Sequence, residues 1–354
     1  IYLKMNEKVN PLIYNCTFVN NEINSVSCEV DGTLIMQNCT FREYSTNELL
    51  NPSSMLSKGN ESGNIFDGCI FEDTTKCGVY IESGIHTFNN CIFQNINTET
   101  ASKKALYVKT PSEYDNEFAT IFVNGCTFIN NSGLSQGGAV FINSKTVASF
   151  DNNRFINNHV NPGLFDRAQG GSVYIKQFTE PIIFTISNCY FENDSSSGTG
   201  GSIYCEFYDI TYSGSSDKMY DIPIIIDNCQ FKKCSSKDRG GAISNGSPSS
   251  YSGSSGDTNT GDIIIQGCHF EECTSSLGGC ISSHDGTEQA DEETNITDCI
   301  FERCEASTLG SCIYSLTYRF YLSNSKFSEQ TKGTSMIYLK MNEKVNPLIY
   351  NCTF

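Results

Sequence analysis

The sequence lacks the features of helical and membrane-spanning proteins. It contains no run of 18 or more consecutive apolar residues, the length that a helix needs to cross a bilayer. No stretch keeps the apolar period of an amphipathic helix. The poor helix formers Gly, Ser and Asn recur throughout the chain. We therefore expect an all-β protein with no membrane span in this segment.

Basic residues and histidines are also scarce. The chain has 23 Lys and Arg against 40 Asp and Glu, a net charge of -17, which repels phosphate backbones and anionic lipid surfaces. This charge excludes nucleic acid as a partner. The 4 His fall at unrelated positions and no Cys-x-x-Cys pair occurs, so the usual zinc spacing is missing. The acidic residues are scattered, whereas glycan cleavage needs carboxylates that converge. We expect no enzyme activity, catalytic residue, metal or cofactor.

Cysteine, in contrast, is abundant. Eighteen cysteines are unusual in a reducing cytosol unless they bind metal, so we expect the protein outside the cell or at the cell surface. Distinct Asn-x-Ser/Thr sequons begin at Asn15, Asn38, Asn60, Asn130, Asn193, Asn245 and Asn295. We take Asn60, Asn130, Asn193, Asn245 and Asn295 as the candidate N-glycosylation sites.

A long repeat organises the chain. The first 18 residues, IYLKMNEKVNPLIYNCTF, recur without a change at 337–354, an offset of 336 residues. We therefore interpret 1–336 as one repeat unit and 337–354 as the start of the next identical unit. Such an exact match indicates recent or homogenised duplication within a tandem array.

A shorter and degenerate period lies inside this unit. It is built on the pattern Asn/Asp/Gly-Cys-x-Phe, and its spacing varies while the motif stays constant, as in solenoids that accept insertions in their turns. The eleven anchors of the unit are Phe18, Phe41, Phe71, Phe93, Phe128, Phe155, Phe191, Phe231, Phe270, Phe301 and Phe327, and Phe354 repeats Phe18.

Each step contains two further strand signals. One follows glycines, at 137–141, 170–174, 200–204 and 240–243, and the other is β-branched and apolar, at 182–186, 224–226 and 263–265. Three short strands per step are the count of a β-helix. We predict an all-β, right-handed parallel β-helix, a solenoid of about eleven three-stranded coils per 336-residue repeat.

Alternation in the motif strand predicts which side chains enter the core. The motif Cys and Phe are two residues apart, so both point to the same face, and stacking of coils aligns like with like. The Phe anchors then form a Phe ladder, and beside it stands a Cys ladder of Cys16, Cys39, Cys69, Cys91, Cys126, Cys189, Cys229, Cys268 and Cys299. Asn153 and Ser325 interrupt the Cys ladder.

Two of these motifs resemble a known family. Gly240-Gly241-Ala242-Ile243 together with Phe128-Ile129-Asn130-Asn131 and its equivalents resembles the GGAI and FxxN repeats of the polymorphic outer-membrane protein family, which has a pectin-lyase-like fold. The resemblance implies a β-helix and an adhesin or surface protein. The chain departs from the family pattern by its motif Cys and by Cys234, Cys273 and Cys304 where Asn stands elsewhere.

The cysteines leave several interpretations open. An inward Cys is commonly a small apolar side chain, and zinc is disfavoured by the spacing. Disulfides are sterically possible because adjacent coils lie about 4.8 Å apart. The candidates lie late in the unit: Cys229, Cys234, Cys268, Cys273, Cys280, Cys299, Cys304 and Cys312.

An aromatic residue recurs after the inward residue of the glycine-preceded strand. The positions are Tyr80, Tyr107, Phe141, Tyr174, Tyr204, Tyr314 and Tyr338. They predict a stacked aromatic stripe on one outer face, which serves either as cross-strand packing under a covering loop or as a surface for lateral contact or sugar stacking.

These features together favour a structural function. A β-helix with open strand edges invites pairing, and 337–354 re-enters the first coil. We expect an extracellular protein that forms a stiff fibre or stalk by end-to-end stacking of copies of itself. The alternative is an adhesin that binds glycans or surface proteins, and a polysaccharide-active enzyme ranks third.

Overall fold

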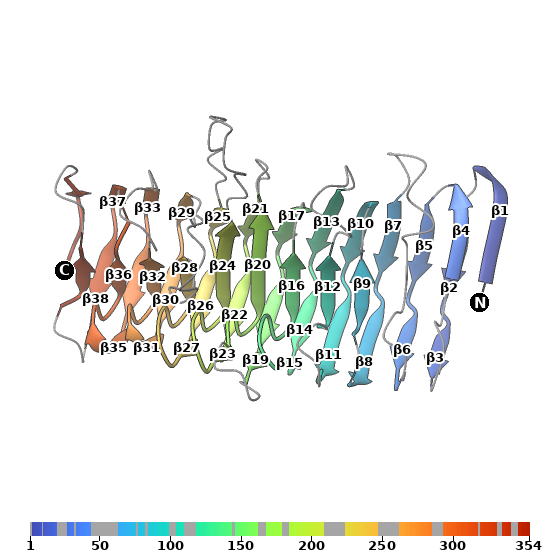
Figure 1. The fold of residues 1–354 in the computed structure, drawn as a ribbon, viewed down its shortest axis with the longest axis horizontal. Coiled ribbons are helices and arrows are strands. Elements are labelled where there is room, and N and C mark those ends of the chain that lie inside the picture. Colours follow the sequence, from blue (N-terminus) through green and yellow to red (C-terminus); the bar gives the residue numbers. More distant parts are fainter. Residues whose placement is uncertain are drawn as a thin grey trace, which may run out of the picture.

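The protein is an all-β solenoid of parallel sheets (Figure 1). The computed structural model describes residues 2–8, 10–19, 27–31, 33–43, 63–75, 77–81, 84–98, 104–109, 118–143, 146–161, 168–178, 184–208, 224–246, 262–284, 293–317, 319–330, 335–340 and 346–354. Every strand pairing within these ranges is parallel, and successive strands of each sheet come from successive windings of the chain. This confirms the predicted fold class as an all-β parallel solenoid.

Two long sheets carry the apolar strand and the motif strand of each winding. Sheet 1 comprises β2 (Leu12–Tyr14), β5 (Leu34–Gln37), β7 (Gly63–Asp67), β10 (Gly84–Asn89), β13 (Ala119–Asn124), β17 (Thr146–Asp151), β21 (Phe184–Ser187), β25 (Ile224–Asp227), β29 (Ile263–Gln266), β33 (Glu293–Thr297), β37 (Arg319–Ser323) and β40 (Leu348–Tyr350). Sheet 2 comprises β3 (Thr17–Val19), β6 (Thr40–Arg42), β8 (Ile70–Thr74), β11 (Ile92–Ile96), β14 (Thr127–Ile129), β18 (Arg154–Ile156), β22 (Tyr190–Glu192), β26 (Gln230–Lys232), β30 (His269–Glu271), β34 (Ile300–Glu302) and β38 (Lys326–Ser328).

The glycine-preceded strands form a third sheet, and a fourth sheet was not predicted. Sheet 3 comprises β9 (Val79–Ile81), β12 (Leu106–Lys109), β16 (Val140–Asn143), β20 (Val173–Phe178), β24 (Ile203–Tyr208), β28 (Ile243–Gly246), β32 (Ile281–His284), β36 (Ile313–Ser315) and β39 (Ile337–Leu339). β1 (Tyr2–Lys8) and β4 (Ser27–Asp31) pair separately. Sheet 4 comprises β15 (Ser132–Gly133), β19 (His159–Val160), β23 (Ser195–Ser196), β27 (Ser235–Ser236), β31 (Thr274–Leu277) and β35 (Glu305–Leu309). The predicted three strands per winding are therefore too few wherever sheet 4 is present, because those windings have a fourth strand.

The motif residue before the Cys forms the sharp turn between sheets 1 and 2. Asn38 has φ 51° and Asn228 has φ 50°, a left-handed conformation that Asn, Asp and Gly tolerate best. The Asn228 amide also donates to Asn188 Oδ1 of the preceding winding at 2.7 Å. This geometry explains why the motif begins with these three residue types.

The glycine pair makes room for sheet 4. A Cβ at Gly241 would lie 2.1 Å from the Gly279 carbonyl oxygen and 2.6 Å from that of Thr274 in sheet 4, so no larger residue fits. Cys77 and Lys104 take the corresponding position in windings that precede the first strand of sheet 4. The Lys104 side chain then reaches Gly133 of β15, where an added Cβ would lie 2.3 Å from Lys104 Nζ.

The Phe ladder runs through the core from end to end. Its ring centroids are 4.6 to 5.1 Å apart between successive members. Ten of the rings stack on a Phe ring both in the winding before and in the winding after, and all ten are buried. They are Phe41, Phe71, Phe93, Phe128, Phe155, Phe191, Phe231, Phe270, Phe301 and Phe327. Phe18 is half-buried. Stacked burial of this kind stabilises each winding through its neighbours.

Candidate functional site: the two copies of the repeated segment

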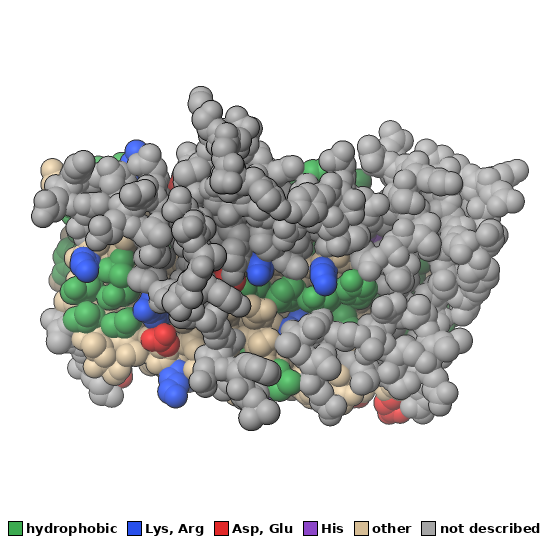
Figure 2. Space-filling model, viewed as in Figure 1, with side chains coloured by type: hydrophobic (Ala, Val, Ile, Leu, Met, Phe, Trp, Pro, Cys, Tyr) green, Lys and Arg blue, Asp and Glu red, His purple; other side chains and the backbone are tan. Residues whose placement is uncertain are grey.

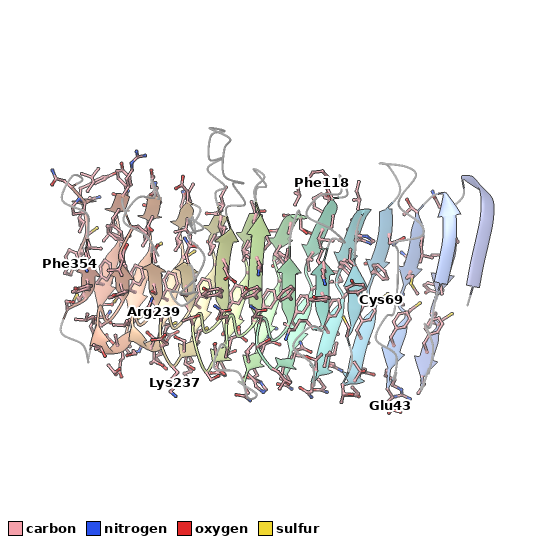
Figure 3. All side chains as sticks on the ribbon, viewed as in Figure 1. Glu43, Cys69, Phe118, Lys237, Arg239 and Phe354 are labelled. Atoms are coloured by element: carbon pink, nitrogen blue, oxygen red, sulfur yellow. A yellow bond between two sulfur atoms is a disulfide. The ribbon has the colours of Figure 1, made fainter. Side chains whose placement is uncertain are left out.

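The two copies of the 18-residue segment lie at opposite ends of the solenoid. The first copy contributes β1, β2 and β3 at the end marked N (Figure 1). The second contributes β39 and β40, and its last residue, Phe354, stands at the other end (Figure 3). One sequence is thus seen in two different surroundings.

The two copies pair through opposite edges of the same strand. In the first copy Leu12 and Ile13 pair with Ile35 and Met36 of the following winding. In the second copy Leu348 and Ile349 pair with Tyr321 and Leu322 of the preceding winding. Leu322, the Ile of the repeated segment and Met36 occupy the same inward-facing row of sheet 1. A single copy of the segment could therefore pair with the winding before it and the winding after it without a change of register.

The backbone hydrogen bonds of the two copies do not compete. In the first copy Asn15 N donates to Gln37 O and the Cys16 carbonyl accepts from Thr40 N, both at 2.9 Å. In the second copy Thr353 N donates to Ser325 O at 2.9 Å and Thr353 O accepts from Phe327 N at 2.8 Å. Since the described bonds use different atoms of the segment, each copy presents the edge that the other uses.

The core ladders also reach both copies. Phe18 stacks on Phe41 at 4.7 Å, and Phe354 stacks on Phe327 at 5.0 Å. The outermost ring is still open to solvent, because Phe354 is 62% exposed. Figure 2 shows hydrophobic side chains on the described surface toward that end of the solenoid.

The Cys ladder lies beside the Phe ladder. Its members Cys39, Cys69, Cys91, Cys126, Cys189, Cys229, Cys268 and Cys299 are buried, and Cys16 is half-buried. The thiols of the eight buried members point at a carbonyl of the preceding winding, as Cys229 Sγ does toward Ile186 O at 3.5 Å. Burial raises the pKa of Cys229 well above its ordinary value. The Cys229 thiol is therefore a protonated donor in the core.

A second ladder stands three residues after the Phe anchor in the windings that carry sheet 4, at the turn that leads to that sheet. We call it the inner polar ladder; in these windings it runs through Asn131, Asn158, Asp194, Cys234, Cys273 and Cys304. Asn131 and Asn158 donate to the carbonyls of Phe93 and Phe128 at 2.9 and 3.0 Å. The sequence contained this signal as the FxxN motif, but its backbone partners depend on how windings stack.

One disulfide joins adjacent windings in this region. Cys304 of the inner polar ladder is bonded to Cys280, which precedes β32, with Cα atoms 6.4 Å apart. The other candidates, Cys229, Cys234, Cys268, Cys273, Cys299 and Cys312, are free thiols. Ala242 and Ser202 take the place of Cys280 in the two preceding windings, so Cys273 and Cys234 meet no cysteine there.

The aromatic stripe is stacked, but most of it is buried. Successive rings from Tyr80 to Tyr204 lie 4.9 to 5.6 Å apart and form a cluster separate from the main core. Tyr107, Phe141, Tyr174, Tyr204 and Tyr314 are buried, and Tyr80 and Tyr338 are half-buried. Of the two interpretations of the stripe, burial favours cross-strand packing for these five rings and contradicts an open contact surface there.

Buried partners explain why the tyrosines tolerate this position. Tyr204 donates its hydroxyl to the Gly246 carbonyl at 2.7 Å, and Tyr174 accepts from Gln136 Nε2 at 2.9 Å. Burial raises the pKa of Tyr107 to about 12. The stripe is interrupted at Ser244 and Ser282, which occupy its row between Tyr204 and Tyr314.

The sequon asparagines have different surroundings. Asn130 and Asn193 are exposed and stand in left-handed turns, each with φ 53°. Asn295 is half-buried in β33. Asn245 is only 2% exposed in β28, so a glycan there has no room in this fold and that candidate is wrong. Asn60 lies outside the described residues.

The described residues contain no group of three or more His, Cys, Asp or Glu side chains placed to hold a metal ion. Within the same ranges there is no helix of the length and apolarity that a membrane crossing requires.

Comparisons with protein-family models, with curated proteins and with solved structures find no match. The resemblance to polymorphic outer-membrane protein repeats therefore rests on the motifs alone.

Proposed function

We propose that this chain is the repeating unit of an extracellular or cell-surface fibre or stalk. In the proposed fibre, units of 336 residues follow one another as a right-handed parallel β-helix of about eleven windings each. The right-handed sense is the one that parallel strand connections adopt almost without exception. The segment that ends one unit and begins the next would serve as an ordinary winding in the middle of the solenoid.

The observation that carries this proposal is the complementary use of edges by the two copies. Ile13 and Ile349 point inward in the same row, and the segment pairs forward in one copy and backward in the other. Exposed strand edges pair readily with a strand of matching register. Here each copy leaves exposed the edge through which the other copy pairs, and the two copies have the same sequence and register.

The adhesin alternative loses one of its two candidate surfaces. It proposed that long loops or the aromatic stripe bind sugars or protein partners, and five of the seven rings of the stripe are buried. The exposed sequons Asn130 and Asn193 are compatible with either function. We therefore keep the fibre as the proposal.

The test is the shape of a chain that contains two units in tandem. Parallel strands stack about 4.8 Å apart, so a unit of eleven windings should advance about 53 Å and two units should form one rod of about 106 Å. Small-angle scattering or electron microscopy measures that length. Two shorter rods joined by a flexible hinge would contradict the proposal.

The junction itself supplies a matched pair of variants. In the two-unit chain, Ile349→Asp places a charge in the core at the junction and should break the rod there. Leu348→Asp changes the neighbouring residue, whose side chain points outward, and should leave one continuous rod. Equal behaviour of the two variants would sink the proposed junction.

A further inference from the structure

One member of the inner polar ladder differs from the rest in its chemistry. Asp194 is fully buried between the windings of Phe155 and Phe231. Its ladder neighbours are Asn158 on one side and Cys234 on the other. Unlike an amide or a thiol, an ionised carboxylate can only accept hydrogen bonds.

The neighbouring side chains of the inner polar ladder donate a hydrogen bond to a backbone carbonyl of the preceding winding. Asn131 and Asn158 each donate through Nδ2 to the carbonyl of the Phe anchor one winding earlier. The thiols of Cys234 and Cys273 make the same bond to Phe191 and Phe231, at 3.7 and 3.5 Å. The corresponding acceptor for Asp194 is the carbonyl of Phe155.

The two oxygens of Asp194 have different surroundings. Oδ1 accepts from the backbone N and the side-chain amide of Asn158, at 2.9 and 3.3 Å, as Asn158 Oδ1 accepts from Asn131. Within the part of the chain that the structure describes, Oδ2 has no hydrogen-bond partner of normal geometry. By its position in the ladder, Oδ2 replaces the Nδ2 group that donates in Asn131 and Asn158.

We propose that Asp194 is a protonated carboxylic acid whose Oδ2–H donates to the Phe155 carbonyl, and that loss of this proton loosens the winding. The proton completes the row of donors, whereas an ionised Oδ2 would face a carbonyl oxygen in the dry core. The site is thus a pH-sensitive point in the solenoid.

The groups around Asp194 support this assignment. The Ser172 and Ser202 hydroxyls from the approach to sheet 3 lie near enough to favour ionisation, as does Asn158, but desolvation outweighs them and raises the pKa of Asp194 to about 7. The thiol of Cys234 faces it from the next winding, and its own pKa is raised well above the ordinary value, chiefly by burial. None of these neighbours carries a positive charge that would hold the carboxylate ionised.

The direct test follows the Asp194 carboxyl by NMR in the 354-residue chain labelled with ¹³C at aspartate Cγ. We expect one aspartate signal to titrate with a midpoint near 7 and to be absent from Asp194→Asn. Asp194→Cys, the residue type of the next ladder position, provides a second variant if the first does not fold. Titration of all aspartates below about pH 5, their ordinary range, would overturn the proposal.

A second measurement tests the loosening. The Asn158 amide donates to Asp194 Oδ1 and the Ser235 amide donates to the Asp194 carbonyl, so hydrogen exchange at both reports on this winding. Relative to Asp194→Asn at the same pH, their protection should fall about ten-fold per pH unit below the midpoint and less steeply near it, or roughly 15-fold between pH 5.5 and 7. The Ile300 amide, which bonds to Cys268 O, should show no such trend. A pH-independent ratio at Asn158 and Ser235 would refute the coupling.

Discussion

Ile13 and Ile349 are the same residue of the repeated segment, and Ile13 is 8% exposed whereas Ile349 is 40% exposed. Each stands in an edge strand of sheet 1 with one paired neighbour among the described residues, Met36 of the next winding for Ile13 and Leu322 of the preceding winding for Ile349. The same residue is therefore covered from opposite sides in the two copies.

This comparison predicts an asymmetry that a second unit should abolish. Ile13→Ala should lower the free energy of unfolding by about 2 to 4 kcal/mol, as for a buried apolar truncation, and Ile349→Ala by clearly less. In a two-unit chain the junction residue has a paired neighbour on both sides, so Ile349→Ala should cost at least as much as Ile13→Ala does. Denaturant unfolding measures all three values, and an unchanged small effect at the junction would contradict the continuous solenoid.

The Phe ladder predicts a large local loss on truncation. Phe231 stacks between Phe191 and Phe270 at 4.8 and 4.9 Å, so Phe231→Ala should cost roughly 3 to 5 kcal/mol. Phe354→Ala is the matched control, because its ring has one stacking partner and is mostly exposed. A similar cost for the two variants would show that stacking within the core is not what stabilises the windings.

The disulfide makes a prediction about connectivity. Peptide mapping without reduction should link Cys280 to Cys304 and find Cys273 and Cys312 as free thiols. Cys280→Ala introduces the residue found at Ala242, and loss of the cross-link should lower stability by about 3 kcal/mol for a loop of this length. Cys273→Ser should retain the cross-link. Linkage of any other pair of these cysteines would contradict the structure.

Lys104 predicts a pH dependence of stability. Burial lowers the pKa of its amine from 10.5 to about 7, and the amine has no hydrogen-bond partner among the described residues. Between these two values the unfolded chain binds a proton that the folded chain does not, so stability rises with pH; below about pH 7 the full penalty of burying the charge is present.

Replacement of Lys104 tests this directly. Lys104→Met should raise the free energy of unfolding at pH 6 by on the order of 4 kcal/mol, and the gain should vanish as the pH approaches 10.5. Lys237→Met, at an exposed position (Figure 3), should change stability little at any pH. A gain at Lys104 that stays constant with pH would exclude titration of the amine as its cause.

The sequence by itself determined which residues share a face and where the chain turns. Cys and Phe two residues apart point inward together, and Asn, Asp or Gly before the Cys takes the left-handed turn. Both properties depend on the local geometry of a strand and of single residues, so a pattern of four residues is enough to predict them. The parallel solenoid follows because the pattern recurs too often to be separate domains.

Only the tertiary structure decided which residues meet across windings. The Cys280 to Cys304 bond, the buried aromatic stripe, the burial of Asn245 and the surroundings of Asp194 all depend on the position of one winding above another. Turns of varying length separate the anchors, so distance along the sequence says little about which residue of the next winding lies opposite. Sheet 4 has the same cause, because its strands are only two to five residues long and become strands by pairing with their neighbours rather than by their own sequence.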